Sequence, residues 1–195
     1  MRSKILNLKY RFGFTLIEVI ASVAIFTLVT LVAYSLYSLG QNTYRRGGAE
    51  MEIWQNARAT LDRMTREVRQ AESLTTILPA TDGDLNNPPA NELQFQSGHD
   101  ASAITYVRYY LDGADLMRQK IAYYFSIQPE VYVACDSQDQ FGNPPQSIIL
   151  EDSLVGEYFT DLDFWQNNNL INIMIHLSKN DRVIDLMTSV YGRNL

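Results

Sequence analysis

The chain has 195 residues, which is enough for one globular domain together with a membrane segment. Its formal net charge is −6, and because basic residues cluster at the start, positions 14–195 carry 12 basic and 22 acidic side chains. This acidic remainder argues against nucleic acid as a partner, because phosphate binding requires a basic surface.

The chain begins with a short basic leader that contains no acidic residue and ends at Gly13. Its positive charges are Arg2, Lys4, Lys9 and Arg11. Positive charge beside a membrane segment favours the cytoplasmic side, and Arg45 and Arg46 beyond the segment weaken this bias without reversing it. We therefore expect a cytoplasmic N-terminus, with the bulk of the chain on the far side of an inner membrane.

An apolar run follows the leader, and no charged residue occurs in the 21 residues from Val19 to Leu39. As a helix this run would extend about 31 Å, enough to cross a hydrocarbon core of about 30 Å. A secretory signal peptide would have a shorter apolar core of about 7–15 residues, and Ser38-Leu39-Gly40 is a poor cleavage site. The sequence therefore predicts a single transmembrane helix.

One carboxylate, Glu18, lies near the beginning of this run. An ionisable side chain within a membrane costs roughly 2.5–3.5 kcal/mol, so Glu18 is a functional candidate that needs a partner. Cleavage between Gly13 and Phe14 would create one, because it leaves an α-amino group on Phe14, one helical turn from Glu18. The carboxylate could pair with this amine in its own chain or in a neighbouring chain. An ordinary signal anchor with a chance Glu is the alternative.

The segment Arg11-Phe12-Gly13-Phe14-Thr15-Leu16-Ile17-Glu18 resembles the class III signal of type IV pilins and of the pseudopilins of type II secretion. These proteins share a basic leader, a Gly before the cut, a Phe after it and a Glu five residues into the mature chain. The resemblance implies that a prepilin peptidase cuts after Gly13 and methylates the amine of Phe14. It also implies that apolar helices bundle into a fibre shaft, in which Glu18 would set the axial register between subunits.

The region Glu50–Thr76 shows the spacing of three and four between apolar residues that is typical of an amphipathic helix. The apolar stripe comprises Met51, Trp54, Ala57, Leu61, Met64, Val68 and Ala71. We interpret it as a helix packed on the chain's own β-sheet rather than as a helix that serves only to bind a partner. Because no proline precedes Pro79, helix could run from Phe14 to Thr76, with a bend or local melting at Gly47-Gly48.

The segment from Pro79 to Asn91 has the composition of a loop and ends the predicted helix. Beyond it, alternating patterns rich in β-branched and aromatic residues predict strands. The predicted strands are Glu92–Ser97, Ile104–Leu111, Asp115–Phe125, Ser147–Glu151, Val155–Trp165, Leu170–Leu177 and Arg182–Tyr191. Asp112-Gly113 indicates a hairpin turn, and Gln138–Gln146 is a further loop.

The expected fold class is α+β, with a long N-terminal helix packed on a C-terminal antiparallel β-sheet domain. The resemblance implies that this architecture is pilin-like. We expect a cleaved leader at 1–13, a transmembrane and assembly helix at 14–46, its amphipathic continuation at 47–78 and a β-rich domain at 79–195. The order of strands and the ending Thr188–Asn194 resemble those of the larger minor pseudopilins of the J type and related minor pilins.

Catalytic signatures are missing from the sequence, which has no Gly-x-Ser-x-Gly, Cys-x-x-Cys, His-Glu-x-x-His or Walker motif. The single cysteine, Cys135, can form no internal disulfide, and we expect it to be buried in or near a strand. Nothing in the spacing links it to His99 or His176. We therefore expect a protein that is not an enzyme and that uses no cofactor.

A partial metal-site pattern occurs in the first loop. Asp82, Asp84 and Asn86 fall at positions 1, 3 and 5 of an EF-hand-like loop, but Asn87 stands where Gly is needed and Leu93 where Glu is needed. A solvated turn is therefore the simpler interpretation. The resemblance keeps calcium open, since some pseudopilins hold this ion in loops of the β-domain.

The sequence and the resemblance together predict a minor pilin or pseudopilin, a structural subunit of a type II secretion pseudopilus or type IV pilus in a tip or priming complex. Its expected partners are other such subunits through the N-terminal helix, a prepilin peptidase and inner-membrane lipid. Two alternatives stay open: a membrane-anchored adhesin or uptake receptor on the same scaffold, and a signal-anchored enzyme. The acidic charge disfavours DNA as a ligand of the former, and the missing motifs disfavour the latter.

Overall fold

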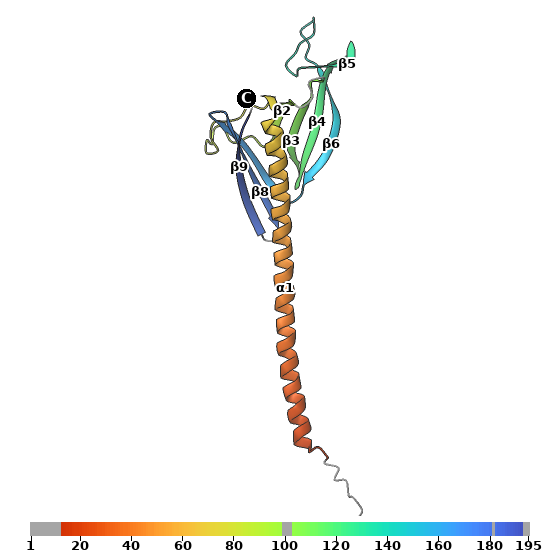
Figure 1. Ribbon diagram of the computed structural model, residues 1–195, viewed down its shortest axis with the longest axis vertical. Helices are drawn as coiled ribbons and strands as arrows, with labels where there is room; N and C mark the ends of the chain where they lie inside the picture. The colour runs from red at the N-terminus through yellow and green to blue at the C-terminus, as the bar shows by residue number, and fades with distance from the viewer. Residues whose placement is uncertain (1–12, 99–102, 181, 193–195) are drawn as a thin grey trace, which may run out of the picture. The chain divides into compact units, whose positions relative to one another are not determined.

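The structure, a computed structural model, describes residues 13–98, 103–180 and 182–192 (Figure 1). The charges of the leader and His99 lie outside these residues. The elements in chain order are α1 (Leu16–Arg69), β1 (Ala71–Leu74), β2 (Leu93–Ser97), β3 (Tyr106–Asp112), β4 (Asp115–Phe125), β5 (Gln128–Val133), β6 (Gln146–Gly156), β7 (Phe159–Asn167), β8 (Leu170–Lys179) and β9 (Arg182–Tyr191). The predicted α+β class, with one long N-terminal helix before antiparallel strands, is confirmed.

The chain divides between Gly47 and Gly48 into two compact units. In the first unit, the hydroxyl side chains of α1 bond to the backbone of their own helix. Ser22, Thr27, Thr30, Ser35 and Thr43 each donate to the carbonyl oxygen four residues earlier, at 2.7–3.0 Å. Because the core of a bilayer offers these hydroxyls no water, such internal pairing suits a helix in lipid.

The glycines of α1 do not interrupt it. Gly40, Gly47 and Gly48 are all helical, so the local melting predicted at Gly47-Gly48 is wrong. Each Gly costs roughly 1 kcal/mol in a helix, but an established helix gains one hydrogen bond for every residue added, which offsets this cost. The bend predicted at the same place stays a prediction.

The second half of α1 buries one face. The buried residues are Ala49, Ile53, Ala57, Thr60, Leu61, Met64 and Val68, which have the predicted helical spacing. The start of the stripe differs from the prediction, because Met51 and Trp54 are 64% and 43% exposed. Ala49 and Ile53 continue the line of Ala57 in steps of four, so they share its face, whereas Met51 and Trp54 lie off it.

The helix ends at Arg69, so the predicted extension to Thr76, and with it the helical region 47–78, is too long. Residues Ala71–Leu74 form β1 instead, which pairs antiparallel with β2. Helical spacing continues in the sequence through Ala71, but pairing with a strand satisfies the backbone of this segment. The connection passes directly against Gly98, where a Cβ atom would lie 2.3 Å from the carbonyl oxygen of Gln70.

The strands form two antiparallel sheets, where a single sheet was predicted. The first has the order β1-β2-β3-β4-β5 with β6 also paired to β4, and the second has the order β7-β8-β9. The chain leaves the first sheet at a turn after Gly156 that contains Tyr158, a non-glycine residue with a φ of 72°. This turn redirects β7, which then pairs with β8. An isolated bridge between Ala90 and Phe164 connects the first loop to the second sheet.

The predicted strands from β2 onward agree with the structure except at β5, at β6 and at the turn before β7. β5 was not predicted, because Pro129 and its flanking polar residues hide the strand pattern. β6 is one strand of 11 residues, whereas the sequence predicted two strands, Ser147–Glu151 and Val155–Trp165, separated at residues 152–154. Polar residues are tolerated there because β6 is an exposed edge strand. The predicted strand Val155–Trp165 also ran wrongly through the turn at Tyr158.

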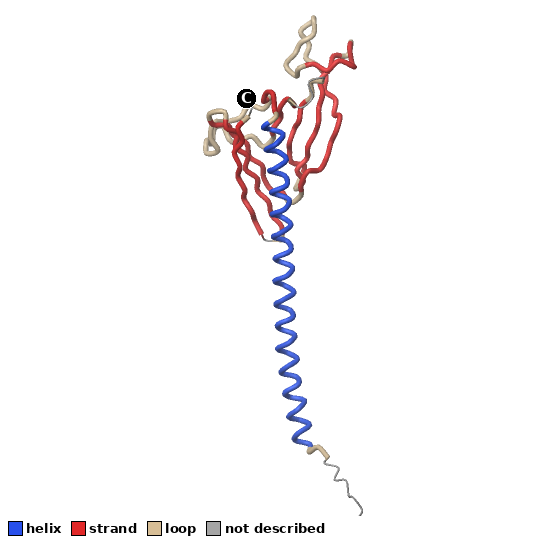
Figure 2. The backbone as a smooth tube through the Cα atoms, in the orientation of Figure 1, coloured by secondary structure: helices blue, strands red, loops and turns tan. Residues whose placement is uncertain are grey.

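The core of the globular unit joins the buried face of α1 to both sheets, so this half of the helix lies between them (Figure 2). The first sheet contributes Leu93, Phe95, Val107, Tyr109 and Leu116, and the second contributes Leu162, Phe164, Ile173, Ile175 and Val190. Burying one large apolar side chain stabilises a fold by about 1.5–3 kcal/mol. The helix is therefore the shared packing surface of the two sheets.

One polar cluster also joins α1 to the first sheet. The carboxylate of Glu67 accepts hydrogen bonds from Nε of Arg118 at 2.9 and 3.1 Å and from the hydroxyl of Tyr109 at 2.9 Å. Nε of Arg63 lies 3.5 Å from the same carboxylate, and Nη1 of Arg118 lies 3.4 Å from Glu151. Burial, together with the charge of Glu67, raises the pKa of Tyr109, which therefore stays protonated and donates.

Replacing Glu67 by Gln is expected to lower the free energy of unfolding by about 2–3 kcal/mol, because Arg118 loses its nearest counter-charge. The side chain of Arg118 is only 11% exposed, so water compensates it poorly. Thermal unfolding of the full chain in nonionic detergent, followed by circular dichroism, measures the loss. Asp62→Asn is the matched control on an exposed position of α1 and should cost less than about 0.5 kcal/mol. Equal losses for the two variants would contradict this role of Glu67.

Candidate functional site

The helix α1 begins two residues after the predicted cleavage site. Gly13 and Phe14 are exposed and precede α1, and Thr15 stands at the N-cap position. Oε2 of Glu18 accepts hydrogen bonds from the backbone N–H and the hydroxyl of Thr15, at 2.9 and 3.0 Å. Oγ1 of Thr15 in turn accepts from the backbone N–H of Glu18 at 3.4 Å. This reciprocal pair is a capping box, which satisfies N–H groups at the start of the helix.

The capping role of Thr15 was missed in the sequence. Its signal was present, because Thr15-Leu16-Ile17-Glu18 has the Thr-x-x-Glu spacing of a capping box before an apolar run. The structure thus gives Glu18 a partner within its own first turn. While the bond between Gly13 and Phe14 is intact, the nitrogen of Phe14 is an amide, so pairing of Glu18 with a Phe14 amine stays a prediction.

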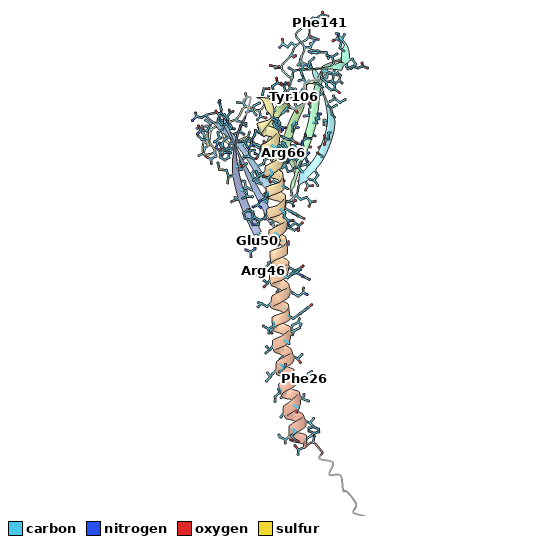
Figure 3. All side chains as sticks on the ribbon, in the orientation of Figure 1. Phe26, Arg46, Glu50, Arg66, Tyr106 and Phe141 are labelled. Atoms are coloured by element: carbon cyan, nitrogen blue, oxygen red, sulfur yellow. The ribbon has the colours of Figure 1, made fainter. Side chains whose placement is uncertain are left out.

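The first half of α1 presents an uncovered apolar surface. The helix is long and apolar enough to cross a membrane, and none of its most apolar 18-residue window is buried. Figure 3 shows the side chains of this segment, with Phe26 labelled, projecting from the helix. The exposed residues include Phe14, Leu16, Ile17, Ile20, Val23, Ile25, Phe26, Leu28, Val29, Leu31 and Val32. A surface of this kind requires lipid or other apolar helices around it.

The partial metal-site pattern forms a hydrogen-bonded turn. Asp82, Asp84 and Asn86 are exposed in the loop between β1 and β2. Oδ1 of Asp84 accepts from the backbone N–H of Asn86 at 2.9 Å, and its carbonyl oxygen accepts from the N–H of Asn87 at 3.1 Å. Within the described ranges, no group of three or more His, Cys, Asp or Glu side chains is arranged to hold a metal ion. The solvated turn stays the simpler interpretation of this pattern, with calcium binding as the open alternative.

The structure places Cys135 and His176 in different surroundings. Cys135 follows β5 of the first sheet, and its backbone N–H donates to the hydroxyl of Tyr106 at 3.0 Å. Its predicted place near a strand is correct, but it is half-buried rather than buried, because it lies in the turn after β5 and not within the sheet. His176 lies in β8 of the second sheet, so the fold does not assemble a thiol–imidazole pair from them.

His176 is held between two carboxylates. Its Nδ1 lies 2.8 Å from Oδ1 of Asp185, and its Nε2 lies 3.4 Å from Oδ2 of Asp163. Burial by itself lowers the pKa of His176, but its hydrogen bonds to the two carboxylates and their charges outweigh burial and raise the pKa. Burial and the neighbouring Asp161 raise the pKa of Asp163, against the opposing effect of His176. The imidazole therefore links β8 to both of its neighbouring strands.

This arrangement predicts a pH-dependent stability. Because its pKa is raised on folding, protonated His176 stabilises the fold fully below its unfolded pKa of about 6.5, and this stabilisation is lost as the pH rises through the folded pKa. Thermal unfolding midpoints of the full chain between about pH 5.5 and 8.5 should fall with rising pH in this window. His176→Gln should flatten the profile, and an unchanged slope in this variant would contradict the assignment.

Comparison with protein-family models gives a match at the start of the chain. Residues 8–34 match the family model described as the prokaryotic N-terminal methylation motif. The matched segment includes Gly13, Phe14, Thr15 and Glu18 and much of the exposed apolar part of α1. No curated protein matches the chain at a significant level. The motif, followed by a long apolar N-terminal helix, fits a type IV pilin-like protein, as the resemblance of the sequence indicated.

Proposed function

We propose that this chain is a minor pilin or pseudopilin, a structural subunit that passes from the inner membrane into a fibre. The observation that carries the proposal is the start of α1. There the methylation motif coincides with a capping box between Thr15 and Glu18, at the beginning of a helix whose apolar surface is uncovered. Lipid would cover this surface before assembly, and the corresponding helices of neighbouring subunits would cover it afterwards.

In the proposed maturation, a prepilin peptidase hydrolyses the peptide bond between Gly13 and Phe14. Water adds across this bond, so that Gly13 leaves with the carboxylate of the leader and Phe14 keeps the nitrogen as a protonated amine. Gly13 precedes the helix, and a Cβ atom at this position would meet no other atom within 4 Å. A small, uncovered residue at the cut allows close approach of the protease backbone. Transfer of a methyl group from a sulfonium donor to the new amine breaks the donor's sulfur–methyl bond and releases one N–H proton, so the methylated amine keeps its positive charge.

Cleavage would change the electrostatics at the start of the helix. The Phe14 ammonium would add a positive charge beside the carboxylate that already accepts from Thr15. In a medium of low dielectric constant an unpaired charge is costly, so the ammonium and Glu18 would favour each other. If the pair forms between neighbouring chains, it offsets the starts of their helices by about one helical turn and so sets the axial register of the fibre.

The proposed membrane orientation, the minor status and the place in the assembly rest on different observations. The basic leader favours a cytoplasmic start and hence a globular unit beyond the inner membrane. A β-rich region of about 115 residues after position 79 is large for a major subunit, which favours a minor one. The place in a tip or priming complex, and the assignment to a secretion pseudopilus or a pilus, follow from the family resemblance.

The intact mass of the membrane-extracted chain tests the maturation step. Co-expression with a prepilin peptidase should remove residues 1–13 and add one methyl group, because the bond after Gly13 is the substrate. Gly13→Leu should block the cut, since a bulky side chain would obstruct the approach of the protease. Gly40→Ala, at an equally uncovered glycine, should be processed normally. An uncut wild-type chain, or a cut near Gly40, would overturn the proposed maturation.

A second experiment separates maturation from assembly. Glu18→Leu should be cut and methylated normally but should fail to co-purify with other pilin-like subunits, because the charge that attracts a neighbouring amine is gone. Thr15→Val is the matched control, since it breaks the capping box and keeps the carboxylate. It should retain most of the co-purification. Equal failure of both variants would show that Glu18 acts through the helix start alone, which would contradict the intermolecular role.

A further inference from the structure

A groove separate from the processing site lies between α1 and the first sheet. Its volume is about 820 Å³. The charged residues that line it are Arg63, Arg66 and Glu67 of α1 and Arg118 and Lys120 of β4, and the apolar lining includes Phe95 of β2. Figure 3 labels Arg66 on the part of α1 that runs beside this sheet. All of these residues belong to the globular unit.

The groove is positively charged on a protein that is acidic overall. Four cationic side chains line it against one carboxylate, Glu67, although the chain has a formal net charge of −6. Arg63 and Arg118 both pair with Glu67. Within the described part of the chain, Arg66 and Lys120 form no salt bridge. Two cations are therefore left to face a ligand.

The base of the groove is fixed before any ligand arrives. Arg118 is largely buried and is held by both oxygens of Glu67, and this carboxylate is itself held by Tyr109. Phe95 is almost fully buried beneath the groove. A rigid floor with charged groups at its rim reduces the entropy lost on binding. In contrast, Arg66 is exposed and Lys120 half-buried, so both can reach an incoming anion.

We propose that this groove binds an acidic peptide segment of a partner protein. Its volume lies in the range of pockets that enclose ligands much larger than a single inorganic anion, so several residues of a peptide would fit. Arginine pairs with carboxylates through two parallel hydrogen bonds, which favours Asp and Glu side chains as the ligand groups. The chain as a whole carries a net negative charge, which would repel a long nucleic acid that extends beyond the groove. The inference does not depend on the proposed maturation.

Binding of a labelled octaglutamate peptide to the full chain in nonionic detergent, measured by fluorescence anisotropy, tests the proposal. The peptide should bind, octaglutamine should not, and added salt should weaken the complex. Arg66→Gln combined with Lys120→Gln should raise the Kd roughly five- to ten-fold, because two accessible ion pairs are lost. These substitutions leave Glu67 and Arg118 in place, so the fold should be retained.

Arg45→Gln combined with Arg58→Gln is the matched control. It removes the same charge from exposed positions of α1 outside the groove, and it should change the Kd by less than about two-fold. Equal weakening by the two double variants, or no binding of octaglutamate, would overturn the proposal. Equally tight, Arg66- and Lys120-dependent binding of octathymidylate would assign the groove to phosphate ligands instead. Because no peptidase is present, none of these outcomes bears on the maturation of the leader.

Discussion

Burial of one face of a single helix between two sheets is the constraint on which the globular unit depends. The apolar side chains of both sheets form one core with the residues of α1 from Ile53 to Val68. Glu67, on the same helix, adds directional contacts to Arg118 and Tyr109 that fix the first sheet against it. Apolar burial supplies most of the stability, and the charged contact supplies the orientation.

The two halves of α1 are built for different surroundings. In the first half, the apolar residues are exposed on every side and the hydroxyl groups bond to the helix itself, which leaves few polar groups to be satisfied by solvent. In the second half, the apolar residues are confined to one stripe and charged residues occupy the rest. The same backbone geometry can thus serve an apolar environment in one half and the core of the globular unit in the other.

The charged groups with proposed functions are held by neighbours that also serve the fold. Glu18 caps its own helix through Thr15 and would meet an ammonium group after cleavage. Arg118 is held by Glu67 at the base of a groove whose outer cations, Arg66 and Lys120, remain accessible. In both places, local hydrogen bonds position a charge in advance, which lowers the cost of binding a partner of the opposite sign.

The sequence by itself determined the features that depend on local order along the chain. These are the N-terminal methylation motif that contains Gly13, Phe14 and Glu18, the uncharged run that follows, the helical spacing through Val68 and the hairpin at Asp112-Gly113. Each depends on residues within a few turns or one hairpin of each other, so periodicity and turn chemistry are sufficient to predict them.

Only the tertiary structure decided the features that depend on residues far apart in the chain. Helical spacing extends through Ala71, but pairing with β2 ends the helix at Arg69. The division into two sheets depends on the turn at Tyr158, and the groove depends on α1 and β4 lying side by side, some 50 residues apart in sequence. Strand pairing and charge clustering follow from through-space contacts, which no short sequence window contains.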